Sequence, residues 1–224
     1  MNTKKYYEIE LFHWAGMLSD NVSQVKDIVQ SHPEYLLSTN KIGDNCLLVA
    51  IQSGNINIVK YLIKETDIDI NFQFVDRYEL PGNNALMCSI LNNKKEITDF
   101  ILENSDIKID AVNIKGKNVY HLAAFNGDAD LIEKLINLDA KKNINKTDNN
   151  NQHCLYDFVD NYIKTRDLWC LEIILENLDL NIIKQKNEEG LNIAEYIQKK
   201  MDSNPITIRD YNPILHLIED RINS

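Results

Sequence analysis

The sequence lacks any apolar run long enough to cross a bilayer, since its longest apolar stretches fall far short of the roughly 18 to 20 residues that a membrane-spanning helix needs. Its first residues, Met1 to Glu10, are charged and tyrosine-rich, with no apolar segment and no cleavage signature. We therefore expect no membrane insertion and no classical signal peptide. The expected location is cytoplasmic, or the cytosol of a host cell if the chain is exported as an effector.

Cysteine is scarce and shows no pairing pattern. The four cysteines, Cys46, Cys88, Cys154 and Cys170, are spread along the chain. Reduced thiols are the simplest interpretation. No spacing of cysteine and histidine resembles a zinc site. We therefore predict no disulfide framework, no metal and no cofactor.

Positive charge is also in short supply. The chain has 24 lysines and arginines against 34 acidic residues, which gives a formal net charge of −10. This charge repels phosphate backbones, and no local cluster of basic residues in the sequence offsets it. Nucleic acid and anionic membranes are therefore excluded as expected partners.

Catalytic motifs are missing as well: there is no glycine-rich phosphate loop, no pair of catalytic acids and no nucleophile elbow. An enzyme would have to use Cys154 beside His153, with an acid such as Asp157 or Asp160. Adjacent residues at a helix start point in different directions, and a thiolate needs a pocket that lowers its pKa. We therefore predict that the protein is not an enzyme and keep this cysteine mechanism only as the least favoured alternative.

What the sequence does contain is an internal repeat. Five residues recur at intervals of 39, 34, 35 and 39 positions, namely Gly43, Gly82, Gly116, Asn151 and Gly190. Two positions after each stand Asn45, Asn84, Asn118, His153 and Asn192. Asparagine is among the best helix N-caps, because its side-chain oxygen accepts a hydrogen bond from an otherwise unpaired amide. Four of the five positions therefore predict the start of a helix.

Each predicted start is followed by an apolar helical face and then by a stop signal. Small residues at Ala50, Ser89 and Ala123 would allow close helix packing. The predicted stops are Gly54, Asn93 and Gly127, whose residue types tolerate the left-handed conformation that closes a helix. A second apolar stripe then follows in each unit, and short Asn- and Asp-bounded stretches join one unit to the next.

These segments resemble ankyrin repeats. The third full unit matches the family pattern most closely, with the residues Gly116, Asn118, Tyr120, His121, Ala123, Ala124, Gly127, Leu135 and Ile136. The Thr-Pro pair of the family pattern is missing from every unit. The resemblance implies an all-α ankyrin-repeat solenoid of stacked helix–turn–helix units with hairpin-like connections.

We predict a single ankyrin-repeat domain over residues 1–224. Its expected parts are an N-terminal partial repeat or cap at 1–39, a repeat at 40–71, a repeat with an extended finger at 72–110, a repeat at 111–144, a repeat with an insertion at 145–182, and a degenerate repeat with a C-terminal cap at 183–224.

The resemblance also implies where a partner would bind. Protein-binding ankyrin repeats usually use the residues beside the repeat glycine and the exposed end of the first helix, which line a concave face. Carried over to this sequence, the partner-binding residues are Lys41, Ile42, Asp44, Gln52, Asn83, Leu91, Ile114, Lys115, Lys117, Phe125, Asn126, Asn149, Asn150 and Gln152. The finger adds Phe72, Phe74, Arg77 and Tyr78, although it could instead fold back onto its own repeats.

The function predicted from the sequence is a non-catalytic, monomeric module that binds another protein through this concave face. The chain contains 29 asparagines and 30 isoleucines, a bias typical of AT-rich genomes such as those of intracellular bacteria. This bias favours a secreted bacterial effector that binds a host protein. The alternative is an adaptor or inhibitor whose partner comes from the same cell.

Overall fold

The computed structural model describes residues 3–17, 21–73, 82–139, 141–204 and 208–223, with side chains described from residue 9 onward. The chain divides into two compact units, Met1–Ile114 and Lys115–Ser224. Across the described ranges, all regular structure is helical and no strand occurs. None of the helices in those ranges is long and apolar enough to cross a bilayer.

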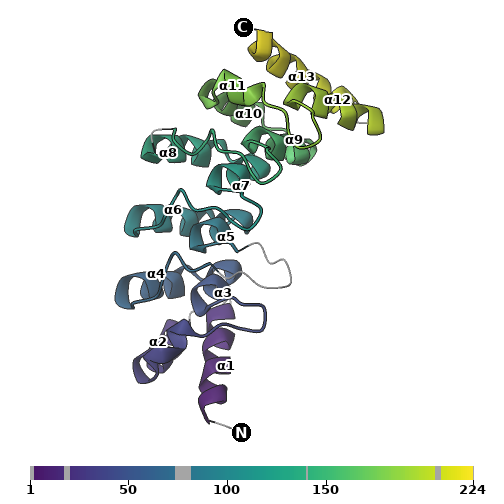
Figure 1. Ribbon diagram of the computed structural model, residues 1–224. Coiled ribbons are helices and arrows are strands. Elements are labelled where there is room, and N and C mark those ends of the chain that lie inside the picture. Colours follow the sequence, from purple (N-terminus) through teal and green to yellow (C-terminus); the bar gives the residue numbers. More distant parts are fainter. Residues whose placement is uncertain (1–2, 18–20, 74–81, 140, 205–207, 224) are drawn as a thin grey trace. The chain divides into compact units, whose positions relative to one another are not determined.

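Unit 1 contains three helix pairs. Its helices are α1 (Thr3–Gly16), α2 (Val22–Ser31), α3 (Cys46–Ser53), α4 (Ile56–Glu65), α5 (Ala85–Leu91) and α6 (Lys95–Asn104), with a 3-10 helix at Pro33–Leu37. The first helices α1, α3 and α5 pack in one layer, and the second helices α2, α4 and α6 pack in another (Figure 1). Each pair thus contributes one helix to each layer, as the repeat pattern predicts.

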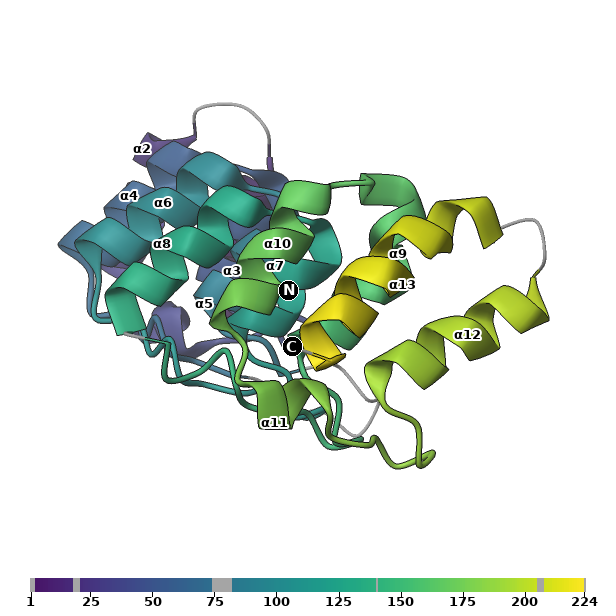
Figure 2. The same cartoon turned by 90° about the horizontal axis from the view of Figure 1, so that it is seen from above.

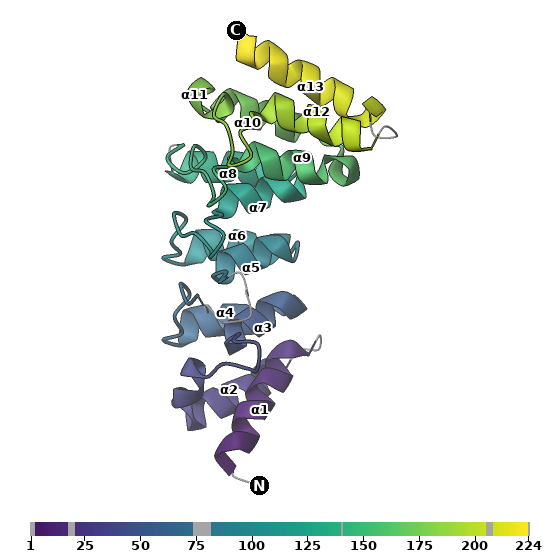
Figure 3. The same ribbon diagram turned by 45° about the vertical axis from the view of Figure 1, so that its right-hand side comes forward.

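Unit 2 has a two-layer arrangement of its own. Its helices are α7 (Val119–Asn126), α8 (Ala129–Asp139), α9 (Cys154–Thr165), α10 (Leu168–Asn177), α11 (Leu180–Ile183), α12 (Ile193–Ser203) and α13 (Ile208–Asn223). Helices α7, α9 and α12 contact one another in sequence, while α8, α10 and α13 form the second layer (Figures 2 and 3). Helices α12 and α13 therefore form a full helix pair.

The asparagine N-caps occur where the sequence predicts them. The side chains of Asn45, Asn84, Asn118 and Asn192 each accept a hydrogen bond from an amide in the first turn of the following helix. The exception is His153, which precedes α9 with the same extended backbone but makes no capping hydrogen bond. Helix α9 therefore begins without the cap that the other four helices have.

The residues that define the repeat adopt the backbone conformation that their types predict. Positive φ angles occur at all five aligned positions, namely Gly43, Gly82, Gly116, Asn151 and Gly190. Gly54, Asn93 and Gly127 are also left-handed, with φ angles of 82°, 53° and 67°. Left-handed backbone is rare outside glycine and asparagine, so these angles confirm the sequence alignment of the repeats.

Close packing of the first helices depends on their small residues. Ala50, Ser89 and Ala123 are fully buried, and α5 and α7 are buried along almost their whole length.

The later first helices are longer, with 12 residues in α9 and 11 in α12 against 8 in α7. Pro213 lies inside α13, which begins at Ile208.

Candidate protein-binding surface

The predicted partner-binding residues that the structure describes are divided between the two units and differ in exposure. Those of unit 1 are Lys41, Ile42, Asp44, Gln52, Phe72, Asn83, Leu91 and Ile114. Those of unit 2 are Lys115, Lys117, Phe125, Asn126, Asn149, Asn150 and Gln152. The exposed members are Lys41, Ile42, Gln52, Leu91, Lys115, Phe125, Asn149 and Asn150, and the others are partly buried. Phe74, Arg77 and Tyr78 lie outside the described residues.

Three of the connections between repeats have the same hydrogen-bonded tip, at residues 40–44, 148–152 and 187–191. In the tip 148–152, Asp148 Oδ1 accepts hydrogen bonds from the amides of Asn150 and Gln152, at 2.9 and 3.0 Å. The Asp148 amide also donates to the Gln152 carbonyl, at 2.9 Å. Asn40 and Asn187 make the same side-chain and main-chain bonds in their own tips. The signal in the sequence is an Asn or Asp three residues before the left-handed residue, and sequence reasoning missed it.

Backbone hydrogen bonds join the tips of unit 2 into a row. The Asn149 amide donates to the Lys115 carbonyl, and the Glu188 amide donates to the Asn150 carbonyl, each at 3.0 Å. A Cβ added to Gly116 would lie 2.7 Å from the Asn149 nitrogen, so glycine is what permits this approach. Predicted contact residues on neighbouring repeats are therefore held in a fixed arrangement.

The exposed ends of the first helices share one position in the repeat, seven residues after the N-cap. In the first three full repeats this position holds Gln52, Leu91 and Phe125. Leu91 and Phe125 expose 39% and 37% of their surface, although the helices that carry them are otherwise almost entirely buried. Gln52 Nε2 donates to Asp44 Oδ2 at 2.8 Å, so the first-helix end and the tip of that repeat are directly bonded.

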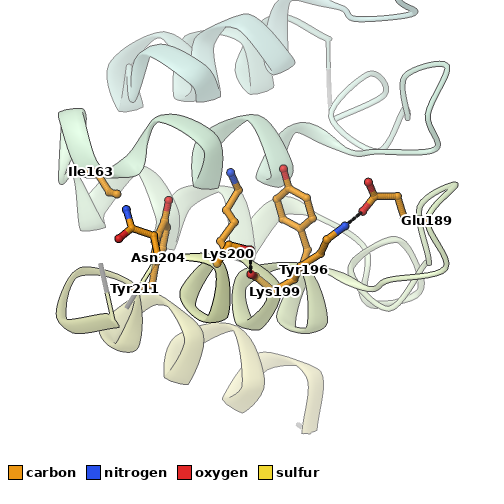
Figure 4. A pocket seen from close by; sticks show the side chains of 8 residues that line it. Ile163, Glu189, Tyr196, Lys199, Lys200, Asn204 and Tyr211 are labelled. Atoms are coloured by element: carbon orange, nitrogen blue, oxygen red, sulfur yellow. Dashed lines mark hydrogen bonds and ion pairs between the residues drawn. The ribbon is translucent and has the colours of Figure 1, made fainter. Parts of the chain in front are cut away.

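The same position in the last two repeats holds Asp160 and Lys199, which the sequence analysis did not name as contact residues. Lys199 lines a groove of about 460 Å³ in unit 2, formed by the end of α9 together with α12 and the start of α13. The lining residues are Ile163, Glu189, Tyr196, Lys199, Lys200, Ser203, Asn204 and Tyr211 (Figure 4). Asp160 accepts from both Tyr196 Oη and Lys200 Nζ, at 2.7 and 2.8 Å. This groove joins segments that no single sequence motif connects.

Beneath the tip 148–152 lies a buried polar cluster. The Lys117 ammonium contacts Asp157 Oδ1 and lies 3.9 Å from Asp148 Oδ2. His121 Nε2 lies 3.1 Å from the Gln152 carbonyl oxygen, and its Nδ1 contacts the Asn118 side chain. The Lys117 ammonium thus pairs with acids of its own chain. The role of Lys117 in contacting a partner stays a prediction.

The cysteine mechanism finds no geometric support. Cys154 and His153 are both completely buried, and neither ring nitrogen of His153 has a hydrogen-bond partner. Burial raises the pKa of the Cys154 thiol far above its usual range and lowers the pKa of His153 to about 3. A thiol in this environment is not prepared for nucleophilic attack.

This burial predicts how the thiols react. Because the side chains of all four cysteines are buried, iodoacetamide at pH 8 should leave the folded protein unmodified over a time in which a free peptide thiol reacts fully. In urea, mass spectrometry should show four modified sites. Rapid modification of Cys154 alone in the folded protein would contradict its burial.

Comparisons with known proteins agree with this architecture. Residues 12–113 match the family described as Ankyrin repeats (3 copies). A comparison with curated protein sequences finds no match. Residues 12–113 therefore match the ankyrin-repeat family, and the described chain has the all-α solenoid fold that the resemblance implied.

Two solved structures extend the likeness in fold to most of the chain. An ankyrin repeat domain from Acinetobacter baumannii AYE matches with a TM-score of 0.70 and 17% identity, over 95% of this chain and 98% of that one. A chain from the complex of a predatory endopeptidase with an immunity protein, from Bdellovibrio bacteriovorus, matches with a TM-score of 0.67 and 19% identity, over 86% of this chain and 92% of that one. Ankyrin repeats are in general non-catalytic modules for protein–protein interaction, which is the class of function that the family supports here.

Proposed function

We propose that this protein is a non-catalytic module that binds a partner protein through its repeat tips and the exposed ends of its first helices. The observation that carries the proposal is the hydrogen bonding within the tips, in which one Asn or Asp side chain accepts from two backbone amides. A surface that is ordered before binding loses less conformational entropy when the partner docks. The exposed tip residues can therefore contribute to affinity without first having to fold.

Leu91 in unit 1 and Phe125 in unit 2 are the apolar anchors that we assign to the first-helix ends. They occupy the same repeat position and each remains more than one third exposed at the end of a buried helix. Removing an exposed apolar or aromatic side chain from water at an interface supplies binding energy, whereas exposed ion pairs supply little. We therefore assign Leu91 and Phe125 larger contributions to affinity than the lysines of the tips.

The variant Leu91→Ala/Phe125→Ala tests this assignment. After a partner has been isolated by affinity capture and identified by mass spectrometry, isothermal titration should show affinity weakened by at least about 30-fold, or about 2 kcal/mol. Leu138→Ala is the matched control, because Leu138 is 51% exposed but lies at the end of the second helix α8. A large loss of affinity in the control, with normal binding by the double variant, would place the partner on the second helices instead.

The source of the partner is a separate part of the proposal. The asparagine- and isoleucine-rich composition favours an effector that acts on a host protein. The alternative, an adaptor or inhibitor of a protein from the same cell, is favoured by the Bdellovibrio bacteriovorus complex, whose title pairs an endopeptidase with an immunity protein. Parallel captures from host lysate and from lysate of the source organism separate the two. A specific partner found only in the source organism would reject the effector role.

A further inference from the structure

Two buried carboxylates of unit 2 share one lysine. The side chains of Asp148 and Asp157 are 1% and 6% exposed, and that of Lys117, which lies beside both, is 22% exposed. Asp148 Oδ2 and Asp157 Oδ2 are buried without a hydrogen-bond partner. If both carboxylates are ionised, one negative charge is left uncompensated in a poorly solvated place, which is energetically costly.

The other groups that face Asp157 do not supply the missing positive charge. They are Asp148 and Asp160, together with the Tyr196 hydroxyl on α12 and the Cys154 thiol. His121 faces Lys117 and Asp148 from α7, and burial lowers its pKa to about 4, which keeps it neutral near pH 7. Burial is also the main reason that the pKa of Asp157 is raised to about 7, although Lys117 opposes the shift. Uptake of one proton would balance the cluster.

The cluster is directly connected to a tip of the proposed binding surface. Asp148 points one carboxylate oxygen toward Lys117 and uses the other to hold the amides of Asn150 and Gln152. When Asp157 is ionised, it competes with Asp148 for the same ammonium. When Asp157 is protonated, Lys117 can pair with Asp148 alone.

We propose that Lys117, Asp148 and Asp157 form a proton-linked latch that tightens the tip 148–152 as the pH falls through neutrality. Its consequence for partner binding rests on the proposed function, whereas the latch itself is a property of the free protein. In this arrangement Lys117 and Asp157 are positioning residues, which act on the partner through the tip. Binding through the tip would be stronger at pH 6 than at pH 8.

The latch can be tested without any partner. In the free protein, NMR should show the Asp157 carboxyl carbon titrating near pH 7, and the Asn150 and Gln152 amide shifts should change with the same midpoint. Asp157→Asn should abolish this transition at both amides. Asp220→Asn is the control, because Asp220 is an exposed acid on α13 outside this cluster, and it should leave the transition in place.

A second variant tests the latch independently if Asp157→Asn does not fold. Lys117→Met removes the shared cation and should raise the Asp157 midpoint by at least one pH unit, because the remaining carboxylates repel each other. The proposal is overturned if Asp157 titrates below pH 5, or if it titrates near pH 7 while the tip amides do not respond. Neither result depends on whether a partner binds, so failure of the latch is distinguishable from failure of the binding surface.

Discussion

Replacement of Gly127 by valine is expected to lower the free energy of unfolding by about 3 to 5 kcal/mol. Gly127 closes α7 with a φ of 67°, a conformation that a β-branched residue adopts only under strain. A Cβ at this position would also lie 2.8 Å from the Thr165 Cβ in the last turn of α9. Strain and steric overlap therefore act together, and urea denaturation followed by circular dichroism measures their sum.

Gly190→Val separates the two causes. Gly190 has a φ of 77°, but no atom lies within 4 Å of the position that a Cβ would occupy. This variant should therefore show the conformational strain alone, a loss of about 1 to 3 kcal/mol. Equal losses in the two variants would mean that α9 does not restrict the space around Gly127.

The second large effect is a loss of stability in acid. Burial lowers the pKa values of His121 and His153 to about 4 and about 3, below the ordinary histidine value of 6.5. Between these values and pH 6.5 the unfolded chain binds protons that the folded chain does not, so the stability present above pH 6.5 is lost as the pH falls. Asp157 has the opposite dependence, because its raised pKa makes the folded state bind the extra proton between pH 3.8 and about 7. We expect the histidines to dominate and the free energy of unfolding to fall by roughly 2 to 3 kcal/mol from pH 7 to pH 4.

His153→Asn tests the histidine contribution directly. Asparagine caps four other helices with nearly the same backbone angles, so the variant should regain a capping bond worth about 1 kcal/mol while it removes two unpartnered ring nitrogens. The difference in free energy of unfolding between this variant and the natural protein should increase by about 2 to 3 kcal/mol, in favour of the variant, from pH 7 to pH 4. His216→Asn, at an exposed site on α13, should change neither the free energy of unfolding nor its dependence on pH. Parallel pH profiles for His153→Asn and the natural protein would show that His153 does not titrate as proposed.

The arrangement of the helices could be predicted closely from the sequence because its determinants are local. A left-handed turn needs glycine or asparagine, and a helix start needs a side-chain acceptor, so residues such as Gly116 and Asn118 identify these positions without tertiary information. The repeat strengthens the prediction, because an ambiguous position in one repeat can be compared with the same position in the others. Asn151 is an example: the repeat spacing alone aligns it with the glycines, and its φ of 60° is left-handed like theirs.

The functional surface was predictable only in part, because exposure and charge pairing depend on which side chains the fold brings together. Leu91 and Phe125 follow from repeat position, but the groove around Tyr196 and Lys199 depends on how α9, α12 and α13 pack. Lys117 has the sequence position of a contact residue, yet its ammonium lies against acids 31 and 40 positions further along the chain.

The sequence by itself determined the repeat, the starts of four first helices and the position of the turns, because each of these depends on interactions within a few residues. Only the tertiary structure decided that the histidine before α9 has no capping bond, that Asp148 links a surface tip to a buried ion cluster, and that Lys117 serves two carboxylates at once. The physical reason is that burial sets the cost of a charge, and burial is a property of the packed repeats that local spacing does not encode.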